Sequence, residues 1–201
     1  MFLIPTRGRP ESVRELISAC YLYGMPDAAV MVGPPRADYD SVRWPKNWRI
    51  HYDTENAGMV AATNKLFALY PDLPWYGFLN DRARPAQEGW VEGLLAHVKG
   101  GWANQAPLNY KHDRPRMKNG IMDGDLVRKR GWFWPPWLVH LYVDDAMEDM
   151  LYDEGLFHQT DVQIIEQPMK KHLREVNGEP FAKRDHDAYM NWRAQTREPA
   201  C

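Results

Sequence analysis

The sequence has few cysteines, no long apolar run and no excess of charge of one sign. Its 201 residues include only two cysteines, Cys20 and Cys201, which excludes a disulfide framework and suits a reducing compartment. No apolar run is long enough for a membrane-spanning helix, so no membrane partner is expected. Lys and Arg number 25 against 27 Asp and Glu, for a net charge of -2, which excludes polyanion binding over the whole surface.

Internal repeats, low-complexity segments and obvious linkers are also absent. The length therefore suits one domain over residues 1–201, with a loop-rich tail from about residue 166. The end of this tail, past about Asp185, either is disordered or docks as a helix. A predicted strand begins at Phe2 and leaves no room for a signal peptide, so we expect a cytoplasmic protein.

Short apolar runs alternate with segments of helical periodicity. Strands are predicted at residues 1–4, 28–32, 48–52, 75–79 and 138–143, with an edge strand at 161–165, and helices at 10–23, 59–70 and 85–98. This alternation predicts an α/β fold with a mostly parallel sheet. Residues 36–48, rich in Pro and Trp, are expected to form a loop.

Polar residues follow the first and third predicted strands. Pro5, Thr6 and Arg7 come after the first strand, before a helix that begins near Pro10, where a phosphate or a base edge can bind. For Arg7, ligand binding and a solvated loop charge are equally open, whereas Arg9 is expected to be solvated. After the third strand, the segment 53–58 favours a turn with special backbone angles at its Asn and Gly.

The stretch Trp75–Trp90 is the expected centre of the protein. Its aromatic strand ends at Asn80-Asp81-Arg82, at the sheet edge where open α/β sheets bind ligands. The carboxylate of Asp81 either holds a divalent metal or caps the next element. Asp144 and Asp145 follow the predicted strand 138–143 and have the same ambiguity, since adjacent carboxylates there supply a general base or a helix cap.

The segment Lys111–Trp137 is basic and aromatic. Between residues 111 and 134, seven Lys or Arg outnumber three Asp, and Trp132, Trp134 and Trp137 follow closely. Such a segment binds sugars or unstacked bases, or it is a solvated basic loop beside core aromatics.

Four motifs in this order resemble the GT-A glycosyltransferases, in particular the family 2-like group and small related proteins often encoded by phages. They are Phe2–Glu11 (FLIPTRGRPE), Asn56–Lys65 (NAGMVAATNK), Gly77–Pro85 (GFLNDRARP) with Gly89-Trp90, and His140–Asp145 (HLYVDD). The resemblance extends from Phe2 to about Asp149. It implies an α/β/α sandwich that transfers a sugar from a nucleotide-diphosphate donor to an acceptor hydroxyl, with inversion if Asp144 is the base.

The resemblance also implies roles for individual residues. Asp144, or less favourably Asp145, takes the acceptor proton, and Asp81 faces the diphosphate. The residues implied on the donor side are Pro5, Thr6 and Arg7 near the base and ribose, with Asn56, Asn64 and Lys65 on the nucleotide side. A divalent metal, Mn²⁺ or Mg²⁺, is the implied cofactor.

Two departures from the family pattern concern that metal. At the metal motif, Arg82 occupies the position where the family usually has a second acid. Gln167 or Met169 occupies the position where the family often has a metal-binding His, and the nearby His172 can replace it if the alignment slips. Because Arg82 repels a divalent cation and attracts phosphate, one hypothesis is that its charge replaces some or all of the metal's role. The alternative is that Arg82 only pairs with Asp81 in an inactive protein.

Three functions remain open from the sequence. A nucleotide-sugar glycosyltransferase is favoured over a non-catalytic sugar- or nucleic-acid-binding module and over a nucleotidyltransferase, whose opening loop should contain more Gly than the segment 5–10. The expected acceptor is a glycan or DNA that carries a hydroxylated base, with the three Trp residues as its contacts. If the protein is phage-encoded, its expected location is the host cytoplasm.

Overall fold

The structure is a computed structural model that describes residues 1–55, 58–107, 116–167 and 181–197. Three residues named above, Asn56, Met169 and His172, lie outside these ranges, as do residues 111–115 of the basic segment. Within the described part of the chain, no helix combines the length and the apolar character that a membrane span requires.

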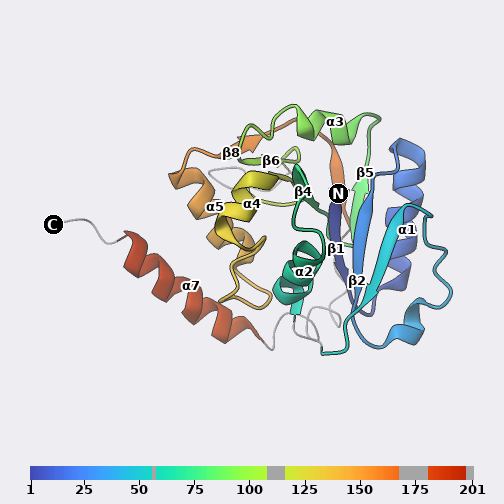
Figure 1. Cartoon of the computed structure of the whole chain (residues 1–201), viewed down its shortest axis with the longest axis horizontal. Helices are drawn as coiled ribbons and strands as arrows, with labels where there is room; N and C mark the ends of the chain where they lie inside the picture. Colours follow the sequence, from blue (N-terminus) through green and yellow to red (C-terminus); the bar gives the residue numbers. More distant parts are fainter. Residues whose placement is uncertain (56–57, 108–115, 168–180, 198–201) are drawn as a thin grey trace.

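A seven-stranded mixed sheet forms the centre of the molecule (Figure 1). Its strands lie in the order β3-β2-β1-β4-β7-β6-β8. Four of the six pairings are parallel and two, β4 with β7 and β7 with β6, are antiparallel. The strands are β1 (Phe2–Thr6), β2 (Ala28–Val32), β3 (Trp48–Tyr52), β4 (Trp75–Phe78), β6 (Trp102–Asn104), β7 (Gly120–Asp123) and β8 (Phe157–Gln159). The predicted mostly parallel α/β sheet is thus confirmed.

A second, two-stranded sheet pairs β5 (Ala83–Pro85) with β9 (Ile164–Glu166) in antiparallel orientation. It brings the segment after β4 next to residues that lie about eighty positions later in the chain. The N–H of Gln167 continues this pairing by donating to the carbonyl of Arg82 over 3.1 Å. Arg82 and Glu166 therefore lie side by side at the edge of the site described below.

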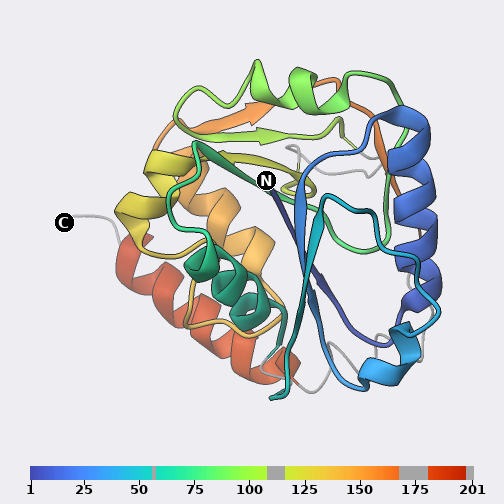
Figure 2. The ribbon, with the colours of Figure 1, turned by 45° about the vertical axis from the view of Figure 1, so that its right-hand side comes forward.

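Helices cover both faces of the central sheet, which gives the predicted three-layer sandwich (Figure 2). On β1, Phe2 and Ile4 pack with α1 and α3, and Leu3 points to the opposite face, as strand geometry requires. The helices on the first face are α1 (Pro10–Tyr23) and α3 (Trp90–Leu95); those on the second are α2 (Gly58–Leu69), α4 (Gly124–Arg130), α5 (Val143–Asp153) and α7 (Ala182–Arg197).

The strand predicted at residues 138–143 is not present, because residues 138–142 form a loop and Val143 begins a helix. α5 begins at Val143, so Asp144 and Asp145 lie in the first turn of a helix. The carboxylate of Asp185, on α7, accepts the N–H groups of Val139, His140 and Leu141 over 3.0, 2.8 and 2.8 Å. The buried carboxylate of Asp185 thus accepts the backbone N–H groups that a neighbouring strand would otherwise accept, and the apolar run is held as a loop.

The remaining differences between the predicted and the observed elements concern short segments. The segment predicted as a helix over 85–98 contains the end of β5 and the short helix α3, and the edge strand expected at 161–165 is β9, at Ile164–Glu166. Residues 36–48 are loop apart from a 3₁₀ turn, η1, at Arg36–Tyr39. β6, β7, α4 and β8 were not predicted, because each is only three to seven residues long and shows no clear periodicity.

Candidate active site at the carboxyl ends of the strands

A first hollow opens at the carboxyl ends of β1, β2 and β3. Pro5, Thr6 and Arg7, predicted on the donor side, all line it. The Nε of Arg7 donates to the carbonyl of Pro34 over 3.3 Å, which holds this side chain along the wall. The other lining residues are Arg9, Met31, Gly33, Asp53, Gly58, Met59, Ala62, His140 and Phe181.

Gly58 closes one side of the first hollow, where α2 begins. Its φ of +91° is a conformation that side chains disfavour. A Cβ at this position would lie 2.5 Å from Cγ1 of Val139 and 2.7 Å from its carbonyl oxygen. Glycine therefore allows the start of α2 to pack directly against the 138–142 loop, as the special turn predicted at this position requires.

A second hollow adjoins the first and shares Pro5, Arg9, Met59 and His140 with it. Its remaining lining residues are Phe78, Asn80, Arg82, Met117, Lys118, Trp134, Leu141, Tyr142, Val143, Asp144 and Glu166. The two hollows hold about 530 and 850 Å³ of space when their open mouths are included. Together they form one cleft, and the shared residues, Arg9 and His140 among them, lie where the two hollows meet.

Asp81 lies beneath this cleft and is fully buried. Its Oδ2 accepts from the hydroxyl of Thr6 over 2.6 Å and lies 2.9 Å from Nε of Arg9. The loop after β1 is also braced by Tyr39, whose hydroxyl contacts Oγ1 of Thr6 at 2.8 Å and accepts the N–H of Arg9 at 3.1 Å. Asp81 thus orients Arg9, whose side chain is only 12% exposed at the junction of the two hollows.

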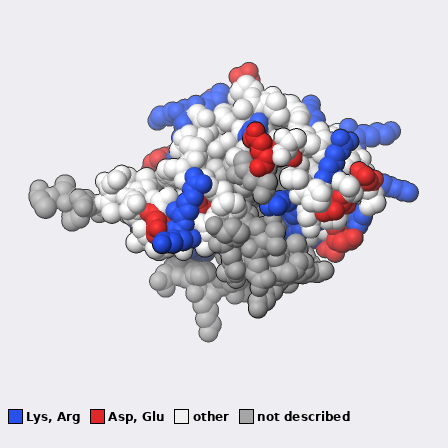
Figure 3. All heavy atoms as spheres, turned by 90° about the horizontal axis from the view of Figure 1, so that it is seen from below, with Lys and Arg blue, Asp and Glu red and all other residues white. Residues whose placement is uncertain are grey.

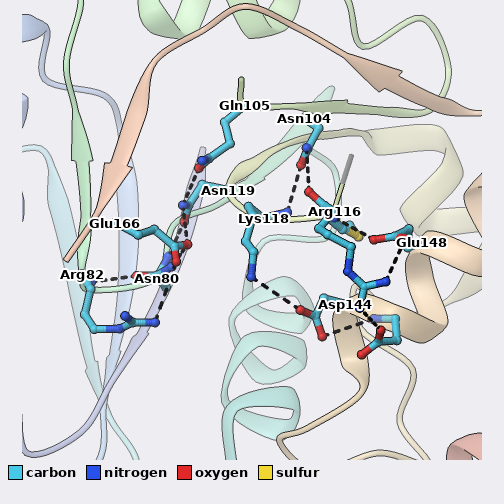
Figure 4. Close-up of polar contacts among 12 residues, drawn as sticks. Asn80, Arg82, Asn104, Gln105, Arg116, Lys118, Asn119, Asp144, Glu148 and Glu166 are labelled. Atoms are coloured by element: carbon cyan, nitrogen blue, oxygen red, sulfur yellow. Dashed lines mark hydrogen bonds and ion pairs between the residues drawn. The ribbon is translucent and has the colours of Figure 1, made fainter. Parts of the chain in front are cut away.

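Asp144 is the carboxylate of the first helical turn that lines the second hollow. Its side chain is 47% exposed, and its Oδ2 lies 3.9 Å from Nζ of Lys118. Figure 4 shows these two side chains extending toward each other. Asp145 instead forms an ion pair with Arg116, which also contacts Glu148 (3.3 Å). Burial and the neighbouring Asp144 raise the pKa of Asp145.

Three solved structures share this architecture at low sequence identity. Glucosyl-3-phosphoglycerate synthase from Mycobacterium tuberculosis, in complex with Mn²⁺, UDP and glucosyl-3-phosphoglycerate, gives a TM-score of 0.68 at 9% identity, over 98% of this chain and 80% of that one. The mannosyltransferase PcManGT from Pyrobaculum calidifontis, with GDP-Man and Mn²⁺, gives 0.62 at 11%, over 94% and 63%. TarS (1–349) of S. aureus, with UDP-GlcNAc, gives 0.55 at 11%, over 86% and 59%.

The chain has the GT-A glycosyltransferase fold. It spans less than two thirds of the length of the mannosyltransferase and TarS chains that it matches. No protein-family model matches the sequence, and no curated protein matches it either. The fold is therefore established by structural likeness, and the activity has to be argued from the residues in the cleft.

The described residues of this GT-A fold do not fit a divalent metal. They contain no group of three His, Cys, Asp or Glu side chains placed to hold one. Asp81, the predicted metal ligand, already pairs with Arg9, and the next residue is the cation Arg82. The second predicted ligand, His172, lies outside the described ranges.

Arg82 lies beside the second hollow and does not pair with Asp81. One of its Nη atoms donates to the carbonyl of Gln167, and the other lies 3.9 Å from Glu166. The side chain is 19% exposed, and its Nε is buried with no hydrogen-bond partner among the described residues.

Two predicted donor residues on α2 lie outside both hollows. The Oδ1 of Asn64 accepts the N–H groups of Phe133 and Trp134, each over 2.9 Å, and its Nδ2 donates to the carbonyl of Trp134 over 2.8 Å. Lys65 pairs with Asp53 (3.0 Å) and Glu55 (3.1 Å), which raise its pKa. Asn64 therefore fixes the aromatic loop, and Lys65 contacts the site only through Asp53, which lines the first hollow.

Only one of the three predicted acceptor residues reaches the cleft. Trp134 lines the second hollow, yet it is almost fully buried in an aromatic cluster with Phe78 and Phe133. Trp137 packs on Trp192 of α7, with ring centroids 5.7 Å apart, and Trp132 lies near the guanidinium of Arg130. The expectation of core aromatics beside the basic segment thus describes most of this region.

Several cleft residues were not predicted as site residues, among them four with ionisable side chains, Arg9, Lys118, His140 and Glu166. Arg9 was expected to be solvated, although its place in the loop after β1 was a signal for ligand contact. Lys118 and Glu166 lie on segments without periodicity, and long-range strand pairings, β4–β7 and β6–β7 for Lys118 and β5–β9 for Glu166, bring them to the site. His140 is in a quoted motif, but a strand would have given no reason to select it. Burial and the nearby Arg9 lower the pKa of His140 to about 4, so its ring is neutral at pH 7.

A hydrogen-bonded network supports the wall that carries Glu166 (Figure 4). One oxygen of Glu166 accepts from the amides of Asn80 (2.5 Å) and Asn119 (3.0 Å). Asn119 also donates to Gln105 over 2.7 Å and accepts the N–H of Asn80 over 2.9 Å. Because each member has partners from other strands, this wall is rigid and keeps Glu166 and Arg82 in place.

Proposed function

We propose that the protein is a glycosyltransferase that moves a sugar from a nucleoside-diphosphate donor to an acceptor hydroxyl. The observation that carries the proposal is the continuous cleft of two hollows, in which cations lie at the junction and in the second hollow and one accessible carboxylate lines the second hollow. In this arrangement the nucleoside binds in the first hollow, the diphosphate lies at Arg9, and the sugar and acceptor meet in the second hollow. The likeness to GT-A structures that contain UDP, GDP-Man or UDP-GlcNAc supports this assignment.

In this proposal Asp144 is the general base of an inverting displacement. A hydroxyl attacks the sugar carbon well only when a carboxylate within hydrogen-bond reach takes its proton. Asp144 is accessible and lies in the first turn of an eleven-residue helix, whose positive end favours a negative charge nearby. Lys118, 3.9 Å away, is close enough to orient it without a direct hydrogen bond. Asp145 is committed to Arg116 and does not line the cleft.

The leaving nucleoside diphosphate gains negative charge as the sugar departs. Arg9, Arg82 and Lys118 are the cations that line the second hollow and meet this charge. His140 is neutral at the junction, so it can donate or accept one hydrogen bond without adding charge. The network behind Glu166 supports Arg82, and Asp81 orients Arg9, so both groups are in place before the donor arrives.

The substitution Asp144→Asn tests the proposal. It should lower kcat by roughly 10²- to 10⁴-fold, because it removes general-base catalysis, and it should leave donor affinity within about threefold. Asp125→Asn is the matched control, since Asp125 lies on α4 with 91% of its side chain exposed and lines neither hollow. The readout is release of UDP or GDP from a panel of nucleotide sugars with glycan and hydroxylated-base DNA acceptors.

Turnover that is unchanged in Asp144→Asn would contradict the role of Asp144, and donor binding without turnover by the wild type would favour a non-catalytic binding module. Pyrophosphate release would favour a nucleotidyltransferase.

For the acceptor, we propose a glycan or other small hydroxyl compound ahead of DNA. Among the described basic residues between 116 and 130, Arg116, Arg128 and Arg130 are paired with carboxylates. On the face shown in Figure 3, Lys and Arg side chains are interspersed with Asp and Glu side chains rather than gathered in one patch. DNA binding that falls steeply with added salt would restore the hydroxylated-base acceptor.

A further inference from the structure

We propose that three side chains of the cleft, Arg9, Arg82 and Lys118, hold the donor diphosphate in place of a divalent metal. This inference rests on the proposed function, because it assumes that a nucleoside diphosphate is the ligand. It starts from the mismatch between the fold and the site. Two of the matched GT-A structures contain Mn²⁺, whereas the described residues here include no group of three ligands for such an ion.

Arg9 lies where the two hollows meet, which is where a diphosphate between a nucleoside and a sugar has to lie. Its Nε faces Asp81 at 2.9 Å, and no hydrogen bond to a described residue occupies its Nη atoms. Asp81 is fully buried beneath the cleft, so it orients the guanidinium of Arg9 from below and does not occupy the space where the diphosphate would bind. The resemblance implied that Asp81 is a metal ligand, and in this proposal it is instead the residue that positions Arg9.

Arg82 supplies the second cation at the position where the family pattern has an acid. Its guanidinium is anchored at one end by the carbonyl of Gln167, and its buried Nε has no hydrogen-bond partner among the described residues. The carboxylate of Glu166, 3.9 Å away, is itself engaged by the amides of Asn80 and Asn119. A planar guanidinium with free donors matches phosphate oxygens well.

Lys118 supplies the third cation from the segment that precedes β7. Its side chain is 27% exposed, and Asp144 at 3.9 Å is beyond hydrogen-bond distance. The close-up in Figure 4 places Arg82 and Lys118 on different segments, beside β5 and β7, with Asp144 below Lys118. The lining of this hollow carries three cations against the two carboxylates of Asp144 and Glu166, so its charge balance favours a diphosphate over a metal ion.

The inference predicts that nucleoside diphosphates bind without metal. Calorimetry would measure the Kd of UDP and of GDP in EDTA and in Mn²⁺, and we expect the two conditions to agree within about threefold for the nucleotide that binds. Binding that requires Mn²⁺ would overturn the inference while leaving the proposed function intact. No binding of either nucleotide in either condition would instead remove the proposed function itself.

Variants of Arg82 separate a charge effect from a structural one. Arg82→Gln should weaken binding of the nucleoside diphosphate in EDTA by roughly tenfold or more, because a charged hydrogen bond is lost. It should leave the Kd of the matching nucleoside, uridine or guanosine, unchanged, and Arg82→Lys should restore most of the diphosphate affinity. The control is Arg43→Gln, since Arg43 is exposed and lines neither hollow. An equal loss for nucleoside and diphosphate would show that Arg82 only supports the fold, which would overturn its role.

Discussion

The bonds from Asp185 to the 138–142 loop give a prediction about both stability and binding. Asp185→Ala removes the acceptor of three backbone N–H groups, those of Val139, His140 and Leu141. Hydrogen bonds to a charged group contribute roughly 1.5 kcal/mol each at the low end, so three of them sum to about 4.5 kcal/mol. Water can reach the partly buried N–H groups of His140 and Leu141, so we expect a loss of about 3 kcal/mol.

The same change should weaken ligand binding, although Asp185 itself lines neither hollow. His140 lines both hollows, and its backbone is held by Asp185. Without these bonds, part of the binding free energy is spent on ordering the loop, so we expect the Kd of the bound nucleotide to rise by roughly tenfold.

Urea unfolding and calorimetry would measure the two effects. The control is Asp187→Ala, two residues further along α7, where the carboxylate is 57% exposed and contacts only His186 among the described residues. This change should cost less than about 0.5 kcal/mol. If Asp185→Ala were as mild as its control, the carboxylate would not be what holds the loop, and the explanation given for the missing strand would fail.

Two further predictions concern stability. Asn64→Ala should lower the free energy of unfolding by about 2–3 kcal/mol, because it removes the side-chain partner of the Phe133 and Trp134 backbone, and the Kd of the donor should stay within about threefold. The control is Asn191→Ala, at an exposed position on α7. A tenfold loss of donor affinity in Asn64→Ala would show that Asn64 does belong to the donor site. Because the pKa of His140 falls from 6.5 to about 4 on folding, the unfolded chain binds more protons between these values, so stability is fully present above about pH 6.5 and is lost as pH falls toward 4. We expect roughly 2 kcal/mol less contribution from this group at pH 4.5 than at pH 7, allowing for its partial exposure. Urea midpoints at the two pH values, in the wild type and in His140→Asn, check this; an unchanged pH slope in the variant would refute it.

The sequence predicted the parallel half of the fold because its strands are apolar or aromatic runs bounded by strong turn signals, and β1 and β2 are buried along their whole length. β2 and β3 have the predicted ends, and α2 begins within one residue of its prediction. The antiparallel half was not predicted, since β6 and β7 are only three and four residues long and depend on long-range pairing. The strand predicted at 138–143 failed for a related reason. Nothing local reveals that its backbone partner is a carboxylate more than forty residues away.

For the site, the sequence located the edge of the sheet better than the individual side chains. Pro5, Thr6, Arg7, Arg82 and Asp144 line or border the cleft, as their positions after predicted elements indicated. Asn64 is in a correctly predicted helix, but its amide faces the 133–134 backbone, which no periodicity can show. Lys118 and Glu166 reach the cleft only through strand pairs formed in the folded state, so their proximity to Arg82 and Asp144 could not be inferred in advance.

The link between Asp185 and the 138–142 loop also has a consequence for biosynthesis. The strands that form the floor of the cleft, β1 to β4, are complete by Phe78, but the loop over it waits for a carboxylate that lies 44 to 46 residues after its partners. During synthesis, the sheet can therefore assemble while the binding cleft is still unfinished. A chain that ends before Asp185 contains every strand of the sheet but lacks the acceptor for three N–H groups of the loop, so we expect it to bind the ligand more weakly than the full chain.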